Sequence, residues 1–598
     1  MKRKPQGRLE LTWMGKESAL IPAEDGKYDY AWVDPSDLRA REVKSIEVTG
    51  TVGEMGGPAG ADQNLLIVGD SGDALRSLGT IPEWSAKYKR KVKLVYIDPP
   101  FNTEQSFEHY ADQLEHSIWL TMMRDRIRDI KPLLADDASV WVHLDDSEVH
   151  RMRVVLDEEF GADKFVATVI WQKKYSRDNR PAIGAVHDYI LVYAPLGPSH
   201  WKNVRNRVPR VNASQYRNPN NEPDGPWRPV PLDVQGGHAT VNQFYDVVTP
   251  SGKVVRPSNG RAWSVTKPVM DAMRANGEIY FGLKGDGKPN TIRHLKDDGG
   301  LVPWTWWPCE EVGHNDESKK EIIELFGDKT VFDTPKPERL MERIIQIGSA
   351  PGDIVLDCFG GSGTTSAVSH KLGRRWVAVE LNEQTVRTFT LPRLTRVVDG
   401  SDGVGISVRP GERFEDESLD GIVKPLDAKV FLQVLSKVLS ADLESITALD
   451  GDTLMREMKD RLNSRVEPVS VESGGGFTTA KIGPSMYEVD DEDGEVYLSP
   501  AATNGDWSKA VAGQLKFNLT PEDPVFCGVR NRQRLAVIDG VADETVVRTV
   551  VEHLAEKEKA VVVAKGVLPE AEALLQELSP GSRIRKAPDD MFPRRTVK

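Results

Sequence analysis

The sequence predicts a doubly wound α/β sheet that binds a ligand at the carboxyl ends of its strands. Three observations support this fold class. Short apolar runs, typical of buried parallel strands, end at Asp98, Asp357 and Glu380. A glycine-rich turn and a helix-like stretch, residues 358–372, separate the second run from the third. A strand, a glycine-rich turn, a helix and a strand ending in an acid together make a nucleoside-binding unit.

The first run, residues 93–97, leads into Asp98-Pro99-Pro100-Phe101. The prolines fix φ, remove two backbone donors and disfavour the α region for the residue before them. The result is a stiff, extended tetrapeptide with a carboxylate, carbonyl acceptors and an aromatic face. This set suits a planar base with an exocyclic amino group, because Asp98 and a proline carbonyl accept from its two N–H bonds and Phe101 stacks on the ring. An ordinary turn is the alternative, and the second motif favours the site.

The glycine-rich turn follows the second run. Glycines let the backbone approach a ligand closely, and Glu380, at the end of the next strand, is placed to accept from two ribose hydroxyls. A dinucleotide site needs a third glycine where the chain has Ser366, and no phosphate-binding G-K-[ST] occurs in the sequence. We therefore expect a nucleoside without a phosphate chain, and S-adenosylmethionine fits. The cofactor-binding residues expected here are Asp357, Phe359, Gly360, Gly361, Ser362, Gly363, Thr364, Thr365 and Glu380.

With the two motifs in this order, the chain resembles the β-ordered, adenine-N6 group of amino-methylating DNA methyltransferases. Within that group it is most similar to the modification subunits of type III restriction systems and related defence methyltransferases. The resemblance covers about residues 60–395. It implies a Rossmann-like, S-adenosylmethionine-dependent methyltransferase fold and methyl transfer to N6 of an adenine flipped out of duplex DNA.

The resemblance also implies further cofactor contacts. Asp70 would accept from the amino group of the cofactor's adenine, and Asp333 and Lys336 lie in the segment that lines the methionine end. One departure is Phe101, where many relatives carry Tyr: stacking survives this change and a hydroxyl is lost.

Three alternatives remain open. Cytosine-N4 methyltransferases share the fold but usually carry Ser before the proline pair, so Asp98 favours adenine. Relatives that methylate protein glutamine carry Asn at that position. A non-catalytic DNA-reading subunit would have no need of Asp98, Phe101, Gly361 and Glu380.

The composition is that of an ordinary globular protein. The chain has 598 residues and a net charge of −13. No apolar run reaches membrane-spanning length, and the basic start, residues 1–4, lacks the apolar core of a signal peptide. Three scattered cysteines make neither a metal site nor a disulfide framework. We expect a cytoplasmic protein with no membrane contact and no metal.

DNA binding requires a local basic surface rather than a positive net charge. Residues 171–180 mix cations with aromatic residues, as in a phosphate and base platform. The alternative is a solvated hairpin tip. The cations expected to contact DNA are Lys173, Lys174, Arg177 and Arg180.

The chain divides by composition into five expected parts. They are an N-terminal arm or linker (1–60), the first catalytic part with the target-amine motif (61–200), a target-recognition insert (201–330), the second catalytic part with the cofactor site (331–400) and a C-terminal α/β assembly region (401–598). Short apolar runs and turn signals predict small β-hairpins in the insert. The expected partners are double-stranded DNA and a second copy of the chain, a separate helicase-nuclease subunit, or both.

Overall fold

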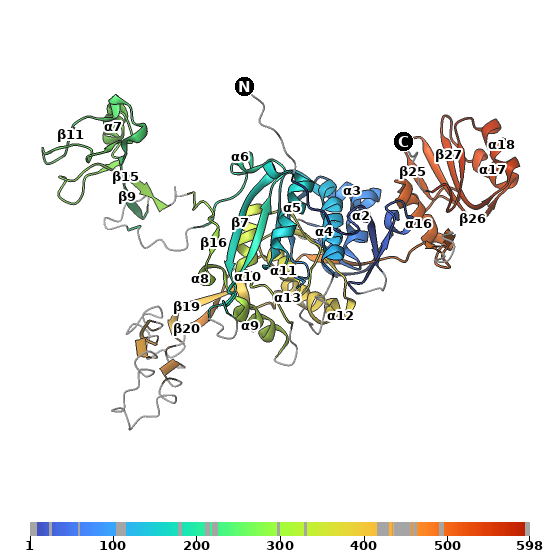
Figure 1. Ribbon diagram of the computed structural model, residues 1–598, viewed down its shortest axis with the longest axis horizontal. Coiled ribbons are helices and arrows are strands. Elements are labelled where there is room, and N and C mark those ends of the chain that lie inside the picture. The colour runs from blue at the N-terminus through green and yellow to red at the C-terminus, as the bar shows by residue number, and fades with distance from the viewer. Residues whose placement is uncertain are drawn as a thin grey trace. The chain divides into compact units, whose positions relative to one another are not determined.

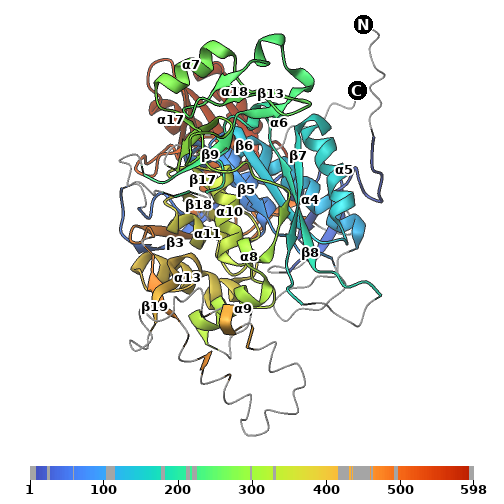
Figure 2. The same cartoon turned by 90° about the vertical axis from the view of Figure 1, so that its left-hand side faces the viewer.

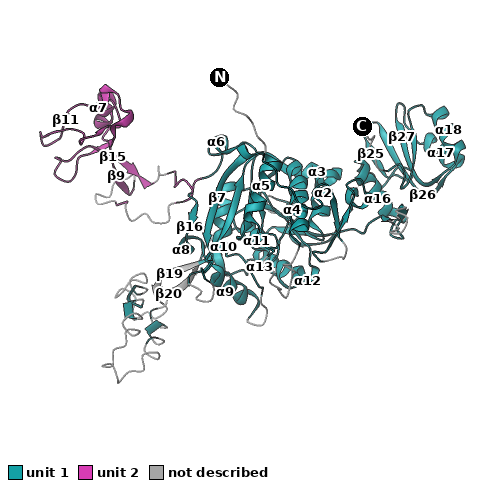
Figure 3. Ribbon diagram, viewed as in Figure 1, with its two compact units in different colours: residues 1–206, 304–598 teal, residues 207–303 magenta. Residues whose placement is uncertain are grey.

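The computed structural model divides into two compact units, residues 1–206 with 304–598 and residues 207–303 (Figure 3). The residues it describes are 9–22, 27–57, 60–102, 115–176, 182–209, 216–217, 225–295, 299–327, 332–414, 471–489 and 496–591, with scattered positions between 428 and 469.

The larger unit is built on a ten-stranded mixed sheet (Figure 1). In spatial order its strands are β16 (Trp306–Trp307), β7 (Phe165–Gln172), β8 (His187–Tyr193), β6 (Leu134–Leu144), β5 (Val92–Ile97), β17 (Ile354–Asp357), β18 (Arg375–Glu380), β4 (Leu65–Val68), β21 (Gly476–Ile482) and β3 (Ile46–Gly53). The consecutive strands from β6 to β21 are parallel, whereas β8 and β3 run antiparallel to their neighbours. The predicted fold class is confirmed.

Helices cover both faces of this sheet (Figure 2). One face carries α2 (Ser71–Thr80), α3 (Pro82–Tyr88), α4 (His116–Ile130) and α5 (Val149–Phe160), and the other carries α10 (Glu338–Gly348), α11 (Thr364–Lys371) and α13 (Leu391–Asp399). Successive side chains of a strand point to opposite faces. In β4, Leu65 and Ile67 accordingly pack in the first layer and Leu66 in the second. Burial on both sides explains why these strands read as continuous apolar runs.

The crevice of the sheet lies between β5 and β17. The chain leaves β5 through α4 on one face and reaches β6, whereas it leaves β17 through α11 on the other face and reaches β18. Adjacent strands whose connections depart to opposite faces leave a gap above their carboxyl ends, and ligands of open α/β sheets bind there.

Three strands come from outside the ranges expected for the catalytic fold. β3 belongs to the expected arm, β21 to the expected assembly region and β16 to the expected insert. The physical reason for β21 is the apolar strand β4, which would otherwise be an exposed edge. Phe477 of β21 is fully buried, with its ring centroid 5.4 Å from that of Trp376. Trp307 of β16 is also fully buried, whereas Trp304 and Trp306 are exposed.

The smaller unit consists of short strands and one helix. They are β9 (Trp227–Pro231), β10 (Asp233–Gln235), β11 (Val247–Val248), β12 (Val254–Val255), β13 (Arg261–Trp263), α7 (Lys267–Ala275), β14 (Ile279–Tyr280) and β15 (Asn290–His294). Their core forms around Trp263, Met270 and Phe281, so most of its tryptophan content serves packing.

The C-terminal part of the larger unit carries a second sheet. Its elements are α16 (Asn504–Leu515), β24 (Asn518–Leu519), β25 (Gly528–Arg530), β26 (Gln533–Ala542), α17 (Glu544–Glu552), β27 (Lys559–Val567), α18 (Pro569–Leu578) and β28 (Arg583–Lys586). The pairs β26–α17 and β27–α18 give this part an α/β architecture. Among the helices in the described ranges, none is long and apolar enough to cross a membrane.

The role of β21 predicts a stability effect. Phe477→Ala should lower the free energy of unfolding by about 3–5 kcal/mol, the usual cost of truncating a buried phenylalanine. Val48→Ala, at an exposed position of the neighbouring strand β3, should change it by less than about 0.5 kcal/mol. Urea denaturation followed by tryptophan fluorescence measures both. Equal, small effects would show that β21 is dispensable for the sheet.

Candidate active site

Three carboxylates meet at one edge of the sheet. β5, β17 and β18 are parallel neighbours; Asp98 follows the first, and Asp357 and Glu380 end the other two. Asp357 is in register with Tyr96 on one side and Ala378 on the other. The structure therefore brings together the three acids that the sequence singled out.

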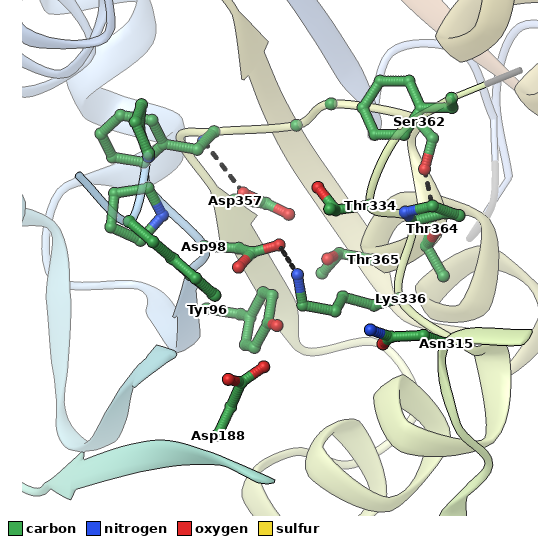
Figure 4. A pocket seen from close by; sticks show the side chains of 18 of the residues that line it. Tyr96, Asp98, Asp188, Asn315, Thr334, Lys336, Asp357, Ser362, Thr364 and Thr365 are labelled. Atoms are coloured by element: carbon green, nitrogen blue, oxygen red, sulfur yellow. Dashed lines mark hydrogen bonds and ion pairs between the residues drawn. The ribbon is translucent and has the colours of Figure 1, made fainter. Parts of the chain in front are cut away.

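A cavity of about 280 Å³ opens above these strand ends (Figure 4). This is close to the roughly 300 Å³ lower end of small-molecule sites. The cavity is lined by residues of both motifs and of the segment before α10: Asp98, Pro99, Pro100, Phe101, Thr334, Lys336, Asp357, Phe359, Gly360, Gly361, Ser362, Thr364, Thr365 and Glu380. Asp333 and Gly363 were also expected at the site, and they adjoin these residues without lining the cavity.

Asp98 has one paired and one unpaired oxygen. Its Oδ2 accepts from Lys336 Nζ at 2.6 Å, and this ammonium lies 5.2 Å from the ring centroid of Phe101. Its Oδ1 is buried and has no hydrogen-bond partner among the described residues. A buried acceptor without a donor is costly, so this oxygen is suited to an N–H group of a ligand.

The two proline carbonyls have different surroundings. The Pro100 carbonyl accepts from Trp119 Nε1 of α4 at 2.7 Å. No donor within the described ranges reaches the Pro99 carbonyl, which leaves it as the acceptor beside Asp98. Asn102, with φ of +62°, ends the loop and donates to the buried Glu148 at 2.9 Å. Hydrogen bonds to α4 and to the N-terminus of α5 therefore hold the loop in place.

The glycine-rich turn wraps tightly against the end of β18. The N–H of Gly361 donates to Glu380 Oε2 at 2.8 Å, and that of Asn382 donates to Oε1 at 2.9 Å. Gly363 has φ of +77°, and a Cβ there would stand 3.0 Å from Thr390 Cγ2. Only glycine adopts this conformation readily. Two other glycines of the turn, Gly360 and Gly361, line the cavity and let the backbone come close to a ligand there.

Burial shifts the ionisation of two of the acids. It raises the pKa of Asp357 to about 7, an effect that the charges of Asp98 and Glu380 increase and hydrogen bonds from Thr365 and Phe359 partly offset. Burial also raises the pKa of Glu380, against the opposing effect of its backbone donors. Low-dielectric surroundings favour the neutral form of a carboxyl group. The crevice therefore carries less negative charge than its three acids suggest.

A buried ionic cluster supports the turn from behind. Glu338 accepts from Lys371 Nζ at 2.8 Å and from Arg393 at 2.9 Å. Arg393 also donates to Thr364 Oγ1 at 2.8 Å, and Lys371 to Asp402 at 2.9 Å. The cluster fixes α10, α11 and α13 to one another and orients Thr364. This cluster could not be predicted from the sequence, because its members are far apart in the chain.

Asp70 has partners inside the protein. Its Oδ1 caps α2 by accepting from the N–H of Gly72 at 2.8 Å, and its Oδ2 accepts from Arg126 at 2.6 Å. Asp70 does not line the cavity. Asp70 thus serves as a helix cap and an ion-pair partner inside the protein, and its expected contact with a cofactor amino group stays a prediction.

The structure describes two of the cations that were expected to contact DNA, and these two have different surroundings. Lys173 Nζ donates to the buried Asp188 at 2.5 Å and lines the cavity, so it is not a free surface cation. Lys174 is exposed. Arg177 and Arg180 lie outside the described residues.

A buried chain of polar side chains leads from Lys173 to Tyr96 of β5. Asp188 Oδ2 contacts His143 Nε2 at 3.3 Å, and His143 Nδ1 contacts the Tyr96 hydroxyl at 2.8 Å. Burial alone would raise the pKa of Asp188, but His143 and Lys173 hold it below its usual value. Asp188 lies beside Tyr96 in the cavity (Figure 4). The sequence alone did not indicate Asp188 as a residue of the site.

Tyr28 is a second residue that the sequence did not indicate. Its ring stacks on Phe359, with centroids 6.2 Å apart and planes 25° apart, and it lines the cavity. Since Tyr28 lies far upstream in the expected linker, no local pattern marked it.

Comparison with known proteins gives consistent relatives. A family model described as DNA methylase matches residues 92–391, half of the chain. The StyLTI Mod subunit, a type III restriction-modification enzyme of Salmonella typhimurium, is 30% identical over 56% of this chain and 57% of its own length. The probable type III HindVI Mod subunit of Haemophilus influenzae is 27% identical over 64% of this chain and 57% of its own length. The chain thus spans just under three fifths of each relative.

Among solved structures, the cytosine-N4-specific PvuII DNA methyltransferase aligns with 57% of this chain and 89% of its own. The identity is 15% and the TM-score is 0.31.

The raised pKa of Asp357 predicts a pH effect on stability. In the folded protein this carboxyl stays protonated up to about pH 7, whereas its ordinary pKa is 3.8. The folded state therefore binds more protons between these values, and this group removes stability as pH rises through that window. Asp357→Asn removes this titrating group. The free energy of unfolding of the mutant should therefore rise relative to that of the wild type by about 1 kcal/mol per pH unit between pH 5 and pH 7. Urea denaturation at several pH values measures this, and parallel pH profiles of the two proteins would contradict it.

Proposed function

Because the chain belongs to the DNA methylase family, we propose that it transfers a methyl group from S-adenosylmethionine to N6 of an adenine in DNA. The observation that carries this proposal is the loop Asp98–Phe101, where a buried, unpaired carboxylate oxygen lies beside the Pro99 carbonyl at the cavity.

The loop is arranged to hold a planar amine. Asp98 Oδ1 and the Pro99 carbonyl accept the two N–H bonds, and Phe101 offers a ring face to the base. As the nitrogen gains positive charge, the two acceptors stabilise it without rearranging. Holding the amine also orients its lone pair, and alignment of the reacting groups is a large part of such catalysis. The base must leave the duplex to reach this cavity.

The described residues fit S-adenosylmethionine. The cofactor supplies an electrophilic methyl group on a sulfonium. Glu380 is placed for its ribose hydroxyls, and the glycine-rich turn admits close approach. Asp333 Oδ2, next to the cavity-lining Thr334, is buried with no partner among the described residues and suits the ammonium group of the methionine.

The choice of adenine depends on Asp98. The alternative is methylation of cytosine N4, an amine that the same pair of acceptors can hold, and the enzymes of that type that this chain resembles usually carry Ser before the proline pair. The family match does not separate the two bases. A full carboxylate at this position favours adenine.

The relatives suggest the setting of this activity. Two of them are named as Mod subunits of type III restriction-modification enzymes, and we infer that this chain is the modification component of such a system, acting on duplex DNA. The exposed Lys174 and Tyr175, at the end of β7, supply a phosphate and base contact. The second sheet, β24 to β28, supplies a surface for a helicase-nuclease partner or a second copy.

The assigned role of Asp98 predicts a catalytic defect without loss of binding. Asp98→Asn should lower methyl transfer to DNA by at least about 10²-fold, the usual scale for a preorganised electrostatic partner. Its affinity for S-adenosylmethionine should stay close to that of the wild type in calorimetry. Asp136→Asn, an exposed carboxylate on β6, is the matched control and should remain active. Near-normal turnover of Asp98→Asn would refute the role.

The exposure of Lys174 predicts a general effect on DNA affinity. Lys174→Ala should weaken binding to all sequences and reduce the salt slope by about one, as expected for one lost phosphate contact. Lys509→Ala, at an exposed position on α16, should change neither quantity. Fluorescence anisotropy at several salt concentrations measures both. An unchanged slope for Lys174→Ala would remove this residue from the DNA contact.

A further inference from the structure

Two N-terminal segments, residues 9–22 and 27–33, are here together called the strap, and the strap packs on α4. It contains the antiparallel pair β1 (Ala19–Pro22) and β2 (Tyr30–Val33). Trp13 Nε1 donates to Thr121 Oγ1 of α4 at 2.7 Å, and Arg124 of α4 donates to the Ser18 carbonyl at 2.9 Å. These bonds attach the strap to the catalytic domain.

The start of β2 is fixed beside the end of β4. The Tyr30 hydroxyl donates to Asp70 Oδ2 at 3.2 Å, and Arg126 lies over the Tyr30 ring at 5.7 Å. Asp70 follows β4, and the N–H of the preceding Gly69 donates to the Glu380 carbonyl at 3.0 Å. Asp70 therefore joins the strap to the edge of the crevice.

The order of the strands determines the order in which the acids at their ends follow one another. From β5 through β17 and β18 to β4, the strand ends carry Asp98, Asp357, Glu380 and Asp70. Neighbouring strands lie about 4.8 Å apart, so Glu380 stands about two strand spacings from Asp98. A ligand that reacts at Asp98 and places its ribose at Glu380 must extend its base further toward β4. Tyr28, stacked on Phe359, lines the cavity there.

We propose that Tyr28 and Phe359 form an aromatic wall for the adenine ring of the cofactor, and that Asp70 positions this wall through Tyr30. The inference rests on the proposed use of S-adenosylmethionine. An aromatic wall fits because every base has a stacking face, and Asp70, which does not line the cavity, acts on this wall from outside it. Burial, reinforced by the charge of Glu380, raises the pKa of Tyr28 well above its usual value. Its phenol therefore stays neutral beside that acid.

The test compares Tyr28→Ala with Tyr28→Phe, which keeps the ring. Two ligands are titrated by calorimetry: S-adenosylmethionine and methylthioadenosine, which has the nucleoside but no amino-acid chain. Tyr28→Ala should weaken both by about tenfold or more, the scale of one lost base–aromatic stack. Tyr28→Phe should bind both within about twofold of the wild type. Thermal unfolding checks that each variant is folded.

A double-mutant cycle separates the positioning role of Asp70 from a direct contact. Asp70→Asn should weaken methylthioadenosine binding in the wild-type background and have little further effect in Tyr28→Ala, since both changes disrupt the same wall. Additive effects would overturn the role of Asp70.

Other outcomes would overturn the wall itself. Unchanged affinities in folded Tyr28→Ala would do so, as would a loss confined to S-adenosylmethionine, which would place Tyr28 at the amino-acid end. A wild-type protein that binds neither ligand would contradict the proposed function, and the wall with it.

Discussion

The structure depends on placing three carboxylates side by side at the ends of three parallel strands. Asp98, Asp357 and Glu380 would repel one another if all were fully charged and unpaired. The fold handles each differently: Lys336 neutralises Asp98, burial keeps Asp357 protonated up to about pH 7, and the N–H groups of Gly361 and Asn382 hold Glu380. Only one of the two oxygens of Asp98 is left buried and unpaired, and this oxygen marks the reacting end of the cavity.

Distant parts of the chain complete this arrangement on the side of β4. β21, from residues 476–482, covers β4, and the strap, from residues 9–22 and 27–33, supplies Tyr28 to the cavity. The ionic cluster around Glu338 reaches Asp402, beyond the last element of the second motif. The cofactor side of the site is therefore not contained in the two motifs alone. Regions that contribute no reactive group still determine whether the crevice keeps its shape.

The two motifs could be predicted because the residues that define each of them are contiguous in the sequence. Asp98–Phe101 and the turn 357–365 combine strand, turn and acid in an order that few other sites use, and the structure brings them to one cavity. Asp70 was expected to contact the cofactor because of the family resemblance, and Lys173 to contact DNA because residues 171–180 mix cations with aromatic residues. Their partners, Arg126 and Asp188, come from other elements. Tyr28 and β21 were missed for the same reason, since packing across hundreds of residues leaves no local periodicity.

The central claim is that the Asp98 loop presents adenine N6 to a methyl donor. The most direct measurement incubates the purified protein with unmethylated duplex DNA and methyl-labelled S-adenosylmethionine, then digests the DNA to nucleosides for mass spectrometry. The account predicts label in N6-methyldeoxyadenosine, and none above background with Asp98→Asn. Label in N4-methyldeoxycytidine instead would contradict the assignment of the base, and an absence of label from DNA under conditions where the cofactor binds would contradict the assigned reaction.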